Sequence, residues 1–285
     1  MPRRHPEWIK VKAPGSPNYL RLKRILRDKN LHTVCEEARC PNIGECWGNK
    51  TATFLILGDT CTRGCRFCAI DKGKPLALDP EEPRNVALVV KDLGLRHIVV
   101  TSVNRDDLPD GGSSHFAKTV FWIKRLSPGI RVELLIPDFD GNLAAVKTVV
   151  DSGIEILNHN IETVPRLYGK VRPGHSYECS LNILSSAKEM RRDVLTKSGF
   201  MLGVGESYAE VVRTLQDLRR NQVDIVTLGQ YLQPSNRQLK VERYVTPDEF
   251  IEFKSAAEKL GFRHVESGPL VRSSYHAWSH VSSES

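Results

Sequence analysis

The placement of cysteine constrains this 285-residue chain more than any other feature, since six of its seven cysteines fall into two groups of three. The later group has CxxxCxxC spacing and consists of Cys61, Cys65 and Cys68. Three thiolates at this spacing can bind three irons of a four-iron cubane cluster, which leaves the fourth iron without a protein ligand. The motif therefore predicts an iron-sulfur cluster with one open coordination position.

Two other uses of the later group remain as alternatives. A disulfide with one spare thiol is disfavoured, because nothing in the sequence indicates export. A zinc site needs four ligands and normally shows paired CxxC motifs. In a reducing compartment, seven cysteines point to metal or redox chemistry rather than to structural disulfides.

The earlier group has CxxxxCxxxxxC spacing and consists of Cys35, Cys40 and Cys46. Pro41 and Gly44 interrupt this segment, so we expect a loop that wraps around a ligand. Packing alone rarely gathers so many cysteines, although free cysteine is a common buried residue. Two clusters are therefore the economical interpretation, and the isolated Cys179 is expected to be a packing residue of a helix.

The later loop, with Phe67 immediately before its last cysteine, resembles the signature of the radical S-adenosylmethionine superfamily. That resemblance implies reductive cleavage of S-adenosyl-L-methionine to a 5′-deoxyadenosyl radical, which abstracts hydrogen from an unactivated carbon. The earlier group narrows the resemblance to the lipoyl synthase family, in which it holds an auxiliary four-iron cluster. In that family the fourth ligand is a serine of a carboxy-terminal RSSY motif. This chain carries Arg272-Ser273-Ser274-Tyr275.

The resemblance implies insertion of two sulfur atoms at C6 and C8 of a protein-bound octanoyl-lysine, with the auxiliary cluster as sulfur donor. The implied cofactors are two [4Fe-4S] clusters and S-adenosyl-L-methionine. The implied partners are an octanoylated lipoyl carrier domain (2-oxoacid dehydrogenase E2 or glycine cleavage H protein), an electron donor such as flavodoxin or ferredoxin, and an iron-sulfur carrier. Ser274 is the preferred iron ligand, with Ser273 as the alternative.

Apolar, β-branched runs alternate with helical stretches along the chain, which is typical of a parallel sheet built from βα units. Strands are expected near 52–57, 97–103, 131–136, 154–158, 195–201 and 225–228. Six such units fit a barrel or an open part-barrel, and a doubly wound sheet is the alternative. The resemblance implies an α/β fold of the (β/α)6 partial TIM barrel type. The expected regions are an extension over 1–50 with the auxiliary ligands, the barrel over 51–262, and an extension over 263–285 with the RSSY motif.

Capping signals predict where several helices begin and end. Ser207 with Glu210, and Thr246 with Glu249, have the spacing of capping boxes ahead of apolar stripes. Ser16 is expected to cap a helix over 17–31. A further helix is expected to begin at 79–82 and to end at Gly94.

Barrel active sites gather at the carboxyl ends of strands, so polar residues there are candidates for cofactor contacts. The candidates are Phe67, Thr101, Ser102, Asn104, Glu133, Asn158, Glu162 and Lys197. His159 is expected to be a hydrogen-bonded residue rather than a ligand. The turn at 172–175 is expected to be solvated, although Arg172 and His175 are possible anion contacts. The glycine-rich turn at 203–206 lacks the GxGxxG pattern of a dinucleotide site.

The formal net charge of +7 is spread along the chain, so it permits an acidic partner without identifying one. No zinc finger, basic heptad helix or aromatic RNA-binding signature appears, which disfavours nucleic acid as a partner. No run of 18 or more apolar residues is present, and the basic start leads to no apolar signal core. A bacterial cytoplasm is the expected location, and the serine-rich end at 279–285 is expected to fray.

Two rival functions remain open at this point. Another radical enzyme would use its auxiliary cluster only for electron transfer. A two-cluster electron carrier would explain six thiols, but neither the open iron of each triplet nor a barrel of this length.

Overall fold

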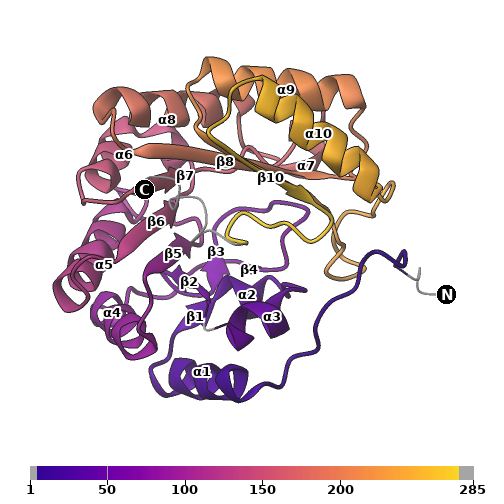
Figure 1. Ribbon diagram of the computed structural model, residues 1–285. Helices are drawn as coiled ribbons and strands as arrows, with labels where there is room; N and C mark the ends of the chain where they lie inside the picture. Colours follow the sequence, from indigo (N-terminus) through magenta and orange to yellow (C-terminus); the bar gives the residue numbers. More distant parts are fainter. Residues whose placement is uncertain (1–4, 50, 276–285) are drawn as a thin grey trace.

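Seven parallel strands form one curved sheet with helices along its outer side (Figure 1). This is a computed structural model, and it describes residues 5–49 and 51–275. In spatial order the parallel strands are β2 (Thr53–Ile56), β5 (His97–Ser102), β6 (Arg131–Leu135), β7 (Ile156–Asn158), β8 (Leu195–Leu202), β9 (Ile225–Gln230) and β10 (His264–Gly268). At the β2 edge of this sheet, the short β1 (His32–Thr33) pairs antiparallel with β2. A separate ribbon, β3 (Thr60–Cys61) and β4 (Asp71–Lys72), brackets the later cysteine loop.

Each parallel strand from β2 to β9 is followed by a helix that packs against the sheet. These helices are α4 (Glu82–Leu93), α5 (Ser113–Leu126), α6 (Leu143–Val150), α8 (Tyr177–Met190), α9 (Tyr208–Arg220) and α10 (Pro247–Lys259). The turn before α8 contains α7 (Tyr168–Val171). Six βα units in succession confirm the partial-barrel prediction, and the sheet stays open between β1 and β10.

The sequence prediction missed β10. Only Val265 of this strand is buried, so the segment lacks the apolar run by which the other strands were recognised. β10 pairs with β9 over five residues, from His264 to Gly268. Because β1 and β10 lie in the two predicted extensions, both extensions contribute a strand to the main sheet.

The capping predictions agree with the structure. The Ser207–Glu210 and Thr246–Glu249 boxes are both formed at the starts of α9 and α10. Gly94 ends α4 with φ of 64°, a left-handed conformation that glycine adopts without strain. Ser16 caps α1 (Pro17–Asp28), which ends three residues earlier than expected.

The earlier cysteine segment differs from the expected loop, because it contains two short helices, α2 (Val34–Glu37) and α3 (Ile43–Gly48). Thr33 caps α2 by accepting a hydrogen bond from the Glu36 amide. Trp47 of α3 is fully buried against Tyr19 of α1, with the ring centroids 5.0 Å apart. Cys35 and Cys46 therefore lie in short helices, and Cys40 lies in the short connection between them.

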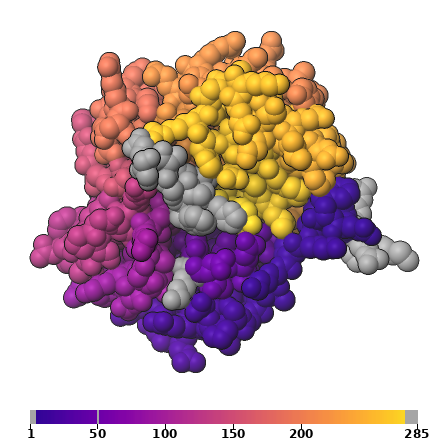
Figure 2. Space-filling view, in the orientation of Figure 1, coloured from indigo at the N-terminus to yellow at the C-terminus, as the bar shows by residue number. Residues whose placement is uncertain are grey.

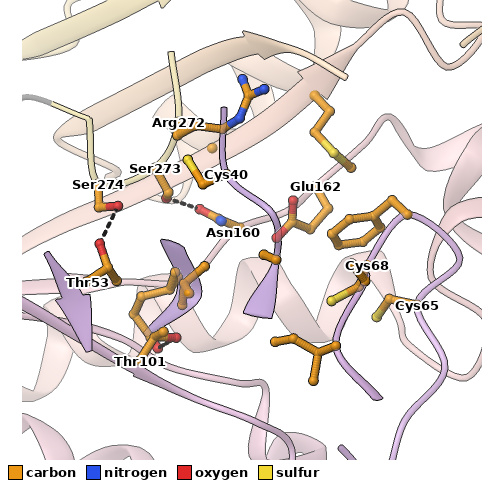
Figure 3. A pocket seen from close by; sticks show the side chains of 18 of the residues that line it. Cys40, Thr53, Cys65, Cys68, Thr101, Asn160, Glu162, Arg272, Ser273 and Ser274 are labelled. Carbon is orange, nitrogen blue, oxygen red and sulfur yellow. Dashed lines mark hydrogen bonds between the residues drawn. The ribbon is translucent and has the colours of Figure 1, made fainter. Parts of the chain in front are cut away.

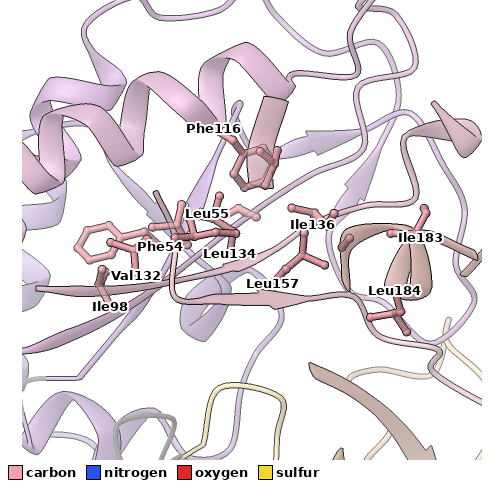
Figure 4. Close-up of a cluster of buried hydrophobic side chains, with 14 of the residues drawn as sticks. Phe54, Leu55, Ile98, Phe116, Val132, Leu134, Ile136, Leu157, Ile183 and Leu184 are labelled. Carbon is pink, nitrogen blue, oxygen red and sulfur yellow. The ribbon is translucent and has the colours of Figure 1, made fainter. Parts of the chain in front are cut away.

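The main hydrophobic core lies between the sheet and the outer helices (Figure 4). β2 is buried along its whole length, as expected for a parallel strand that is covered on both sides. Phe116 of α5 is fully buried and packs edge-on against Phe139. In the part of the chain that the structure describes, no helix is both long and apolar enough to cross a bilayer. The serine-rich end at 279–285 lies outside the described residues.

A buried ion pair crosses the inner face of the sheet between β6 and β8. Lys197 Nζ lies 2.9 Å from Glu133 Oε1, and both side chains are 0% exposed. The same carboxylate oxygen accepts a hydrogen bond from Asn158 Nδ2 at 2.7 Å. Burial alone would raise the pKa of Glu133, but Lys197 and His97 outweigh it and hold this pKa at about 2. Burial lowers the pKa of Lys197, and the charge of Glu133 opposes that shift.

We expect Glu133→Gln to lower the free energy of unfolding by about 3–5 kcal/mol, because it removes the negative charge that lies 2.9 Å from the buried Lys197 ammonium. A Glu133→Leu/Lys197→Met double variant should lose less, since it removes both charges of the pair together. Urea denaturation of the metal-free protein measures both values. A double variant that is less stable than Glu133→Gln would contradict this interpretation.

The same pair predicts a pH dependence. Folding lowers the pKa of Glu133 from 4.5 to about 2, so its contribution to stability is complete above pH 4.5 and is lost as the pH falls towards 2. The stability of the wild type relative to the double variant should therefore shrink between pH 5 and 3. Denaturation curves at several pH values measure this difference, and a constant difference would refute the assignment.

Candidate active site

A cavity of about 510 Å³ opens at the carboxyl ends of the parallel strands. Residues from both cysteine groups and from the carboxy-terminal tail line it: Cys35, Cys40, Cys61, Cys65, Cys68, Ser273 and Ser274. Figure 3 shows Cys65 and Cys68 on one side and Cys40 with the two serines on the other. Segments from three distant parts of the sequence therefore face one shared space.

All seven cysteines are free thiols, so neither group is closed by a disulfide. Cys61 ends β3, and its sulfur accepts hydrogen bonds at 3.4 Å from the backbone amides of Arg63 and Asn104. Such donors stabilise a thiolate, the form that binds iron. Among residues 5–49 and 51–275, no three His, Cys, Asp or Glu side chains gather as ligands of a single metal ion. Two sets of three free thiols, five of which line one cavity, fit iron-sulfur clusters in the chemistry of their donors.

Burial controls the protonation of these thiols. It raises the pKa of Cys68 to about 12, and it does the same for Cys35. Cys46 lies outside the cavity lining, but its pKa is also raised to about 12 by burial and by the nearby Cys35 and Cys40. Cys35, Cys46 and Cys68 are thus protonated at neutral pH when nothing is bound, and binding of a cationic group must release their protons.

An ion-pair network that the sequence prediction missed fixes the later cysteine loop. Arg63 binds Asp106 through two nitrogens and lies 2.7 Å from Asp138. His175 lies 2.6 Å from the same Asp138, and its Nε2 is 3.5 Å from Cys65 Sγ. Asp138 follows β6 at the sheet edge, and that position is the only sequence signal that pointed to it. Arg63 and His175 line the cavity together with Cys65, so the network holds Cys65 in place at the cavity wall.

Five of the eight predicted cofactor contacts line the cavity: Phe67, Thr101, Ser102, Asn104 and Glu162. Glu162 has φ of 66°, a left-handed conformation that is unusual for a residue with a side chain. Burial raises the pKa of this carboxyl, and the Arg172 guanidinium opposes that shift. Strained backbone at a cavity wall is typical of functional positions.

The other three predicted contacts, Glu133, Asn158 and Lys197, do not line the cavity. Lys197 is the third residue of the eight-residue β8, so it lies within the strand rather than at its carboxyl end. Asn158 ends β7 as expected, but its side chain is fully buried and binds Glu133.

The histidine and arginine predictions had mixed outcomes. His159 is hydrogen-bonded as expected, to the Ile136 carbonyl at 2.9 Å and to Ser180 at 3.0 Å. Burial lowers the pKa of His159 to about 4, so it is neutral at physiological pH. The turn at 172–175 is not simply solvated, because Arg172 is buried and both Arg172 and His175 line the cavity.

The carboxy-terminal tail docks against the earlier cysteine segment. Asn42 Nδ2 donates to the Leu270 carbonyl at 2.7 Å, and the Tyr275 hydroxyl donates to Glu45 at 3.2 Å. Arg272 is partly buried beside Cys40, where each charge favours the other. Figure 2 shows the yellow end of the chain meeting the indigo amino-terminal part on one face of the molecule.

The two serines of the tail differ in their hydrogen bonds (Figure 3). Ser273 Oγ accepts from Asn158 Nδ2 at 3.1 Å and donates to Asn160 Oδ1 at 2.6 Å. Ser274 Oγ accepts from Thr53 Oγ1 at 2.7 Å. The Ser273 hydroxyl thus makes both of its hydrogen bonds with residues of the barrel, Asn158 and Asn160. Ser274 lies on the side of β2, next to the earlier triplet.

Close approach of the tail depends on Gly229 of β9. A Cβ atom at this position would lie 2.1 Å from the Val271 carbonyl oxygen and 3.3 Å from Arg272 Nη1. The first contact is with backbone, which cannot rotate away. Glycine at position 229 is therefore a steric requirement for the docked tail.

We expect Gly229→Ala to displace the tail and to speed amide hydrogen exchange in residues 269–275 roughly tenfold or more, since overpacking at such a contact costs about 1–3 kcal/mol. Gly169→Ala in α7 is the matched control, because a Cβ there meets nothing within 4 Å. Exchange followed by mass spectrometry on the metal-free protein measures both variants. Equal protection of the tail in Gly229→Ala and wild type would contradict the steric argument.

Family models match most of this chain. The model of the Radical SAM superfamily matches residues 55–218, and that of the N-terminal domain of lipoyl synthase of the Radical SAM family matches residues 2–40. The structure is similar to Streptococcus suis SuiB bound to S-adenosylmethionine, with a TM-score of 0.59, 10% identity, and coverage of 90% of this chain and 58% of that one. It is also similar to methylornithine synthase, with a TM-score of 0.50, 18% identity, and coverage of 88% and 78%. At these identities the two solved structures show the fold alone.

Relatives found by sequence share a much higher identity with this chain than the two solved structures do. The lipoyl synthase of Rubrobacter xylanophilus is 58% identical over 272 residues, which cover 95% of this chain and 85% of the relative. The lipoyl synthase of Roseiflexus sp. strain RS-1 is 56% identical over 281 residues, covering 99% and 93%. The chain belongs to the lipoyl synthase family of radical SAM enzymes, sulfurtransferases that insert sulfur at C6 and C8 of a protein-bound octanoyl group.

Proposed function

We propose that this enzyme works with two four-iron clusters, one bound by Cys61, Cys65 and Cys68 and one by the earlier triplet with Ser274. The observation that carries this proposal is that the tail serines and members of both triplets line one cavity. When bound, the first cluster supplies one electron to S-adenosyl-L-methionine, and the auxiliary cluster supplies sulfur as a consumed substrate. A shared cavity lets an octanoyl chain meet both.

The cofactor contacts we propose are Phe67, Thr101, Ser102, Asn104 and Glu162. They come from the cysteine loop and from the ends of β5 and β7, so they surround the later triplet from two sides. Their contribution is placement, because a primary carbon radical attacks almost any C–H bond unless geometry restricts it. Arg172 and His159 are buried where they line the cavity, so this part of its wall is closed to solvent.

Ser274 is the proposed fourth auxiliary ligand because the hydroxyl of Ser273 is already engaged on both sides. A serine oxygen is a less covalent ligand of iron than a thiolate, so the iron that it holds is the easiest to release. This property suits a cluster that is taken apart during the reaction. Arg272 adds a positive charge beside Cys40, which favours the thiolate.

The substrate of the family is an octanoylated carrier protein, and we propose an acidic lipoyl domain of a 2-oxoacid dehydrogenase E2 or a glycine cleavage H protein. The net charge of +7 suits such a partner. A flavodoxin or ferredoxin as electron donor, an iron-sulfur carrier that rebuilds the auxiliary cluster, and a cytoplasmic location complete the proposal. The regions 1–50, 51–262 and 263–285 would supply the auxiliary cysteines, the barrel and the serine ligand.

Iron and acid-labile sulfide content tests the number of clusters. Anaerobically prepared wild type should contain about eight irons per chain, and Cys35→Ala about four, since each cubane cluster holds four. Cys179→Ala is the control and should keep the wild-type content, because Cys179 lies outside the cavity lining. About four irons in the wild type would rule out a second four-iron site.

The fate of the auxiliary cluster distinguishes sulfur donation from electron transfer. In a single turnover with an octanoylated carrier domain, the auxiliary cluster signal in Mössbauer spectra should fall in step with lipoyl product. Sulfur donation consumes that cluster, whereas electron transfer leaves it unchanged. An intact auxiliary cluster after product formation would overturn the proposal in favour of the rival radical enzyme.

A further inference from the structure

A continuous series of polar contacts runs from the barrel interior to the carboxy-terminal tail. It begins at Lys197, passes through the carboxylate of Glu133 to the amide of Asn158, and reaches the hydroxyl of Ser273. Residues 158 and 273 are 115 positions apart in the sequence. The series therefore connects strands β6, β7 and β8 with a segment that follows the last strand.

Asn158 is the central member of this series. Its Nδ2 donates to Glu133 Oε1 at 2.7 Å and to Ser273 Oγ at 3.1 Å, and the residue is 0% exposed. Its Oδ1 has no hydrogen-bond partner among the described residues. A buried amide is costly unless its polar atoms are paired. Asn158 does not line the cavity. The two hydrogen bonds of Nδ2 therefore explain why an amide side chain occupies this buried position.

The ion pair determines which way the amide faces. Glu133 is held by Lys197 and is buried on all sides, so its oxygen can only accept. Asn158 must therefore present Nδ2, and Ser273 must accept from it. The single proton of Ser273 is then left for Asn160 Oδ1, at 2.6 Å. Both hydrogen-bonding functions of Ser273 are fixed by groups of the barrel.

We propose that Asn158 is a positioning residue that fixes Ser273 and thereby determines where the next residue, Ser274, presents its hydroxyl to the auxiliary site. This inference rests on the proposed role of Ser274 as iron ligand. Two further contacts, Asn42 with Leu270 and Tyr275 with Glu45, hold the tail on either side of the serines. Loss of the Asn158 bond should therefore loosen the tail at Ser273 without detaching it.

Three variants test the anchor directly. Asn158→Leu removes the donor at similar volume, Ser273→Ala removes the acceptor from the tail side without changing the barrel interior, and the third variant combines both. Each single variant should speed amide exchange of residues 271–275 in the metal-free protein about threefold to tenfold, the effect expected for one hydrogen bond. Ser273→Ala removes the bond to Asn160 as well, so the double variant should match Ser273→Ala and not exceed it, because the Asn158 bond is already lost there.

The second measurement follows the iron. A ferrous chelator, bathophenanthroline disulfonate, should extract the first iron of the auxiliary site faster from Asn158→Leu and Ser273→Ala than from wild type. Ser274→Ala serves as the reference in which the ligand itself is absent, and it should be at least as fast. The Cys35→Ala variant lacks the auxiliary site and identifies the iron that is being followed.

The outcomes separate this inference from the proposal on which it rests. If Ser274→Ala speeds extraction while Asn158→Leu and Ser273→Ala change neither extraction nor exchange, the anchor is refuted and Ser274 remains a ligand. Faster exchange in both single variants, with extraction from Ser274→Ala at the wild-type rate, supports the anchor and refutes Ser274 as ligand. Additive exchange effects in the double variant would also refute the anchor, because the two residues would then act independently.

Discussion

Parallel pairing of seven strands is the constraint on which the rest of this structure depends. Parallel strands all end at the same edge of a sheet, so the loops that follow them must come together there. The later cysteine loop, the end of β5 and the end of β7 meet for this reason. Curvature of the sheet then turns a row of loops into a cavity.

The cavity is completed by segments from outside the six βα units. The earlier triplet arrives before β2, and the serine tail arrives after β10. Hydrogen bonds between Asn42 and Leu270 and between Glu45 and Tyr275 join the two. Neither segment has a large apolar face of its own, so each depends on the barrel and on the other for its position. The tail reaches its place only because Gly229 leaves room for its backbone.

Charge inside the barrel is balanced in two separate layers. Near the cavity, Arg63, Asp138 and His175 surround Cys65 and hold the loop that carries it. Further inside, Glu133 and Lys197 neutralise each other where no water reaches. The first layer positions Cys65 at the cavity wall. The second is connected to the tail by Asn158, so it positions the other end of the cavity.

Sequence reasoning identified the elements of the fold where local signals were strong. Capping boxes at Ser207 and Thr246 and the apolar runs of β2, β5 and β6 depend on residues close together in the chain. β10 was missed because its pairing with β9, rather than its own composition, makes it a strand. The short helices around Cys40 were missed because Pro41 and Gly44 are strong local signals for a loop.

The sequence by itself determined which atoms are available for chemistry: two sets of three thiols and a pair of hydroxyls at fixed spacing. It also determined the order of the βα units, since hydrophobic periodicity is a local property. Only the tertiary structure decided which of these groups face each other. In the structure, Glu133, Asn158 and Lys197 lie outside the cavity lining, whereas Arg172 and His175 are part of it. Side-chain direction depends on strand register and on contacts between residues more than a hundred positions apart, which no local pattern records.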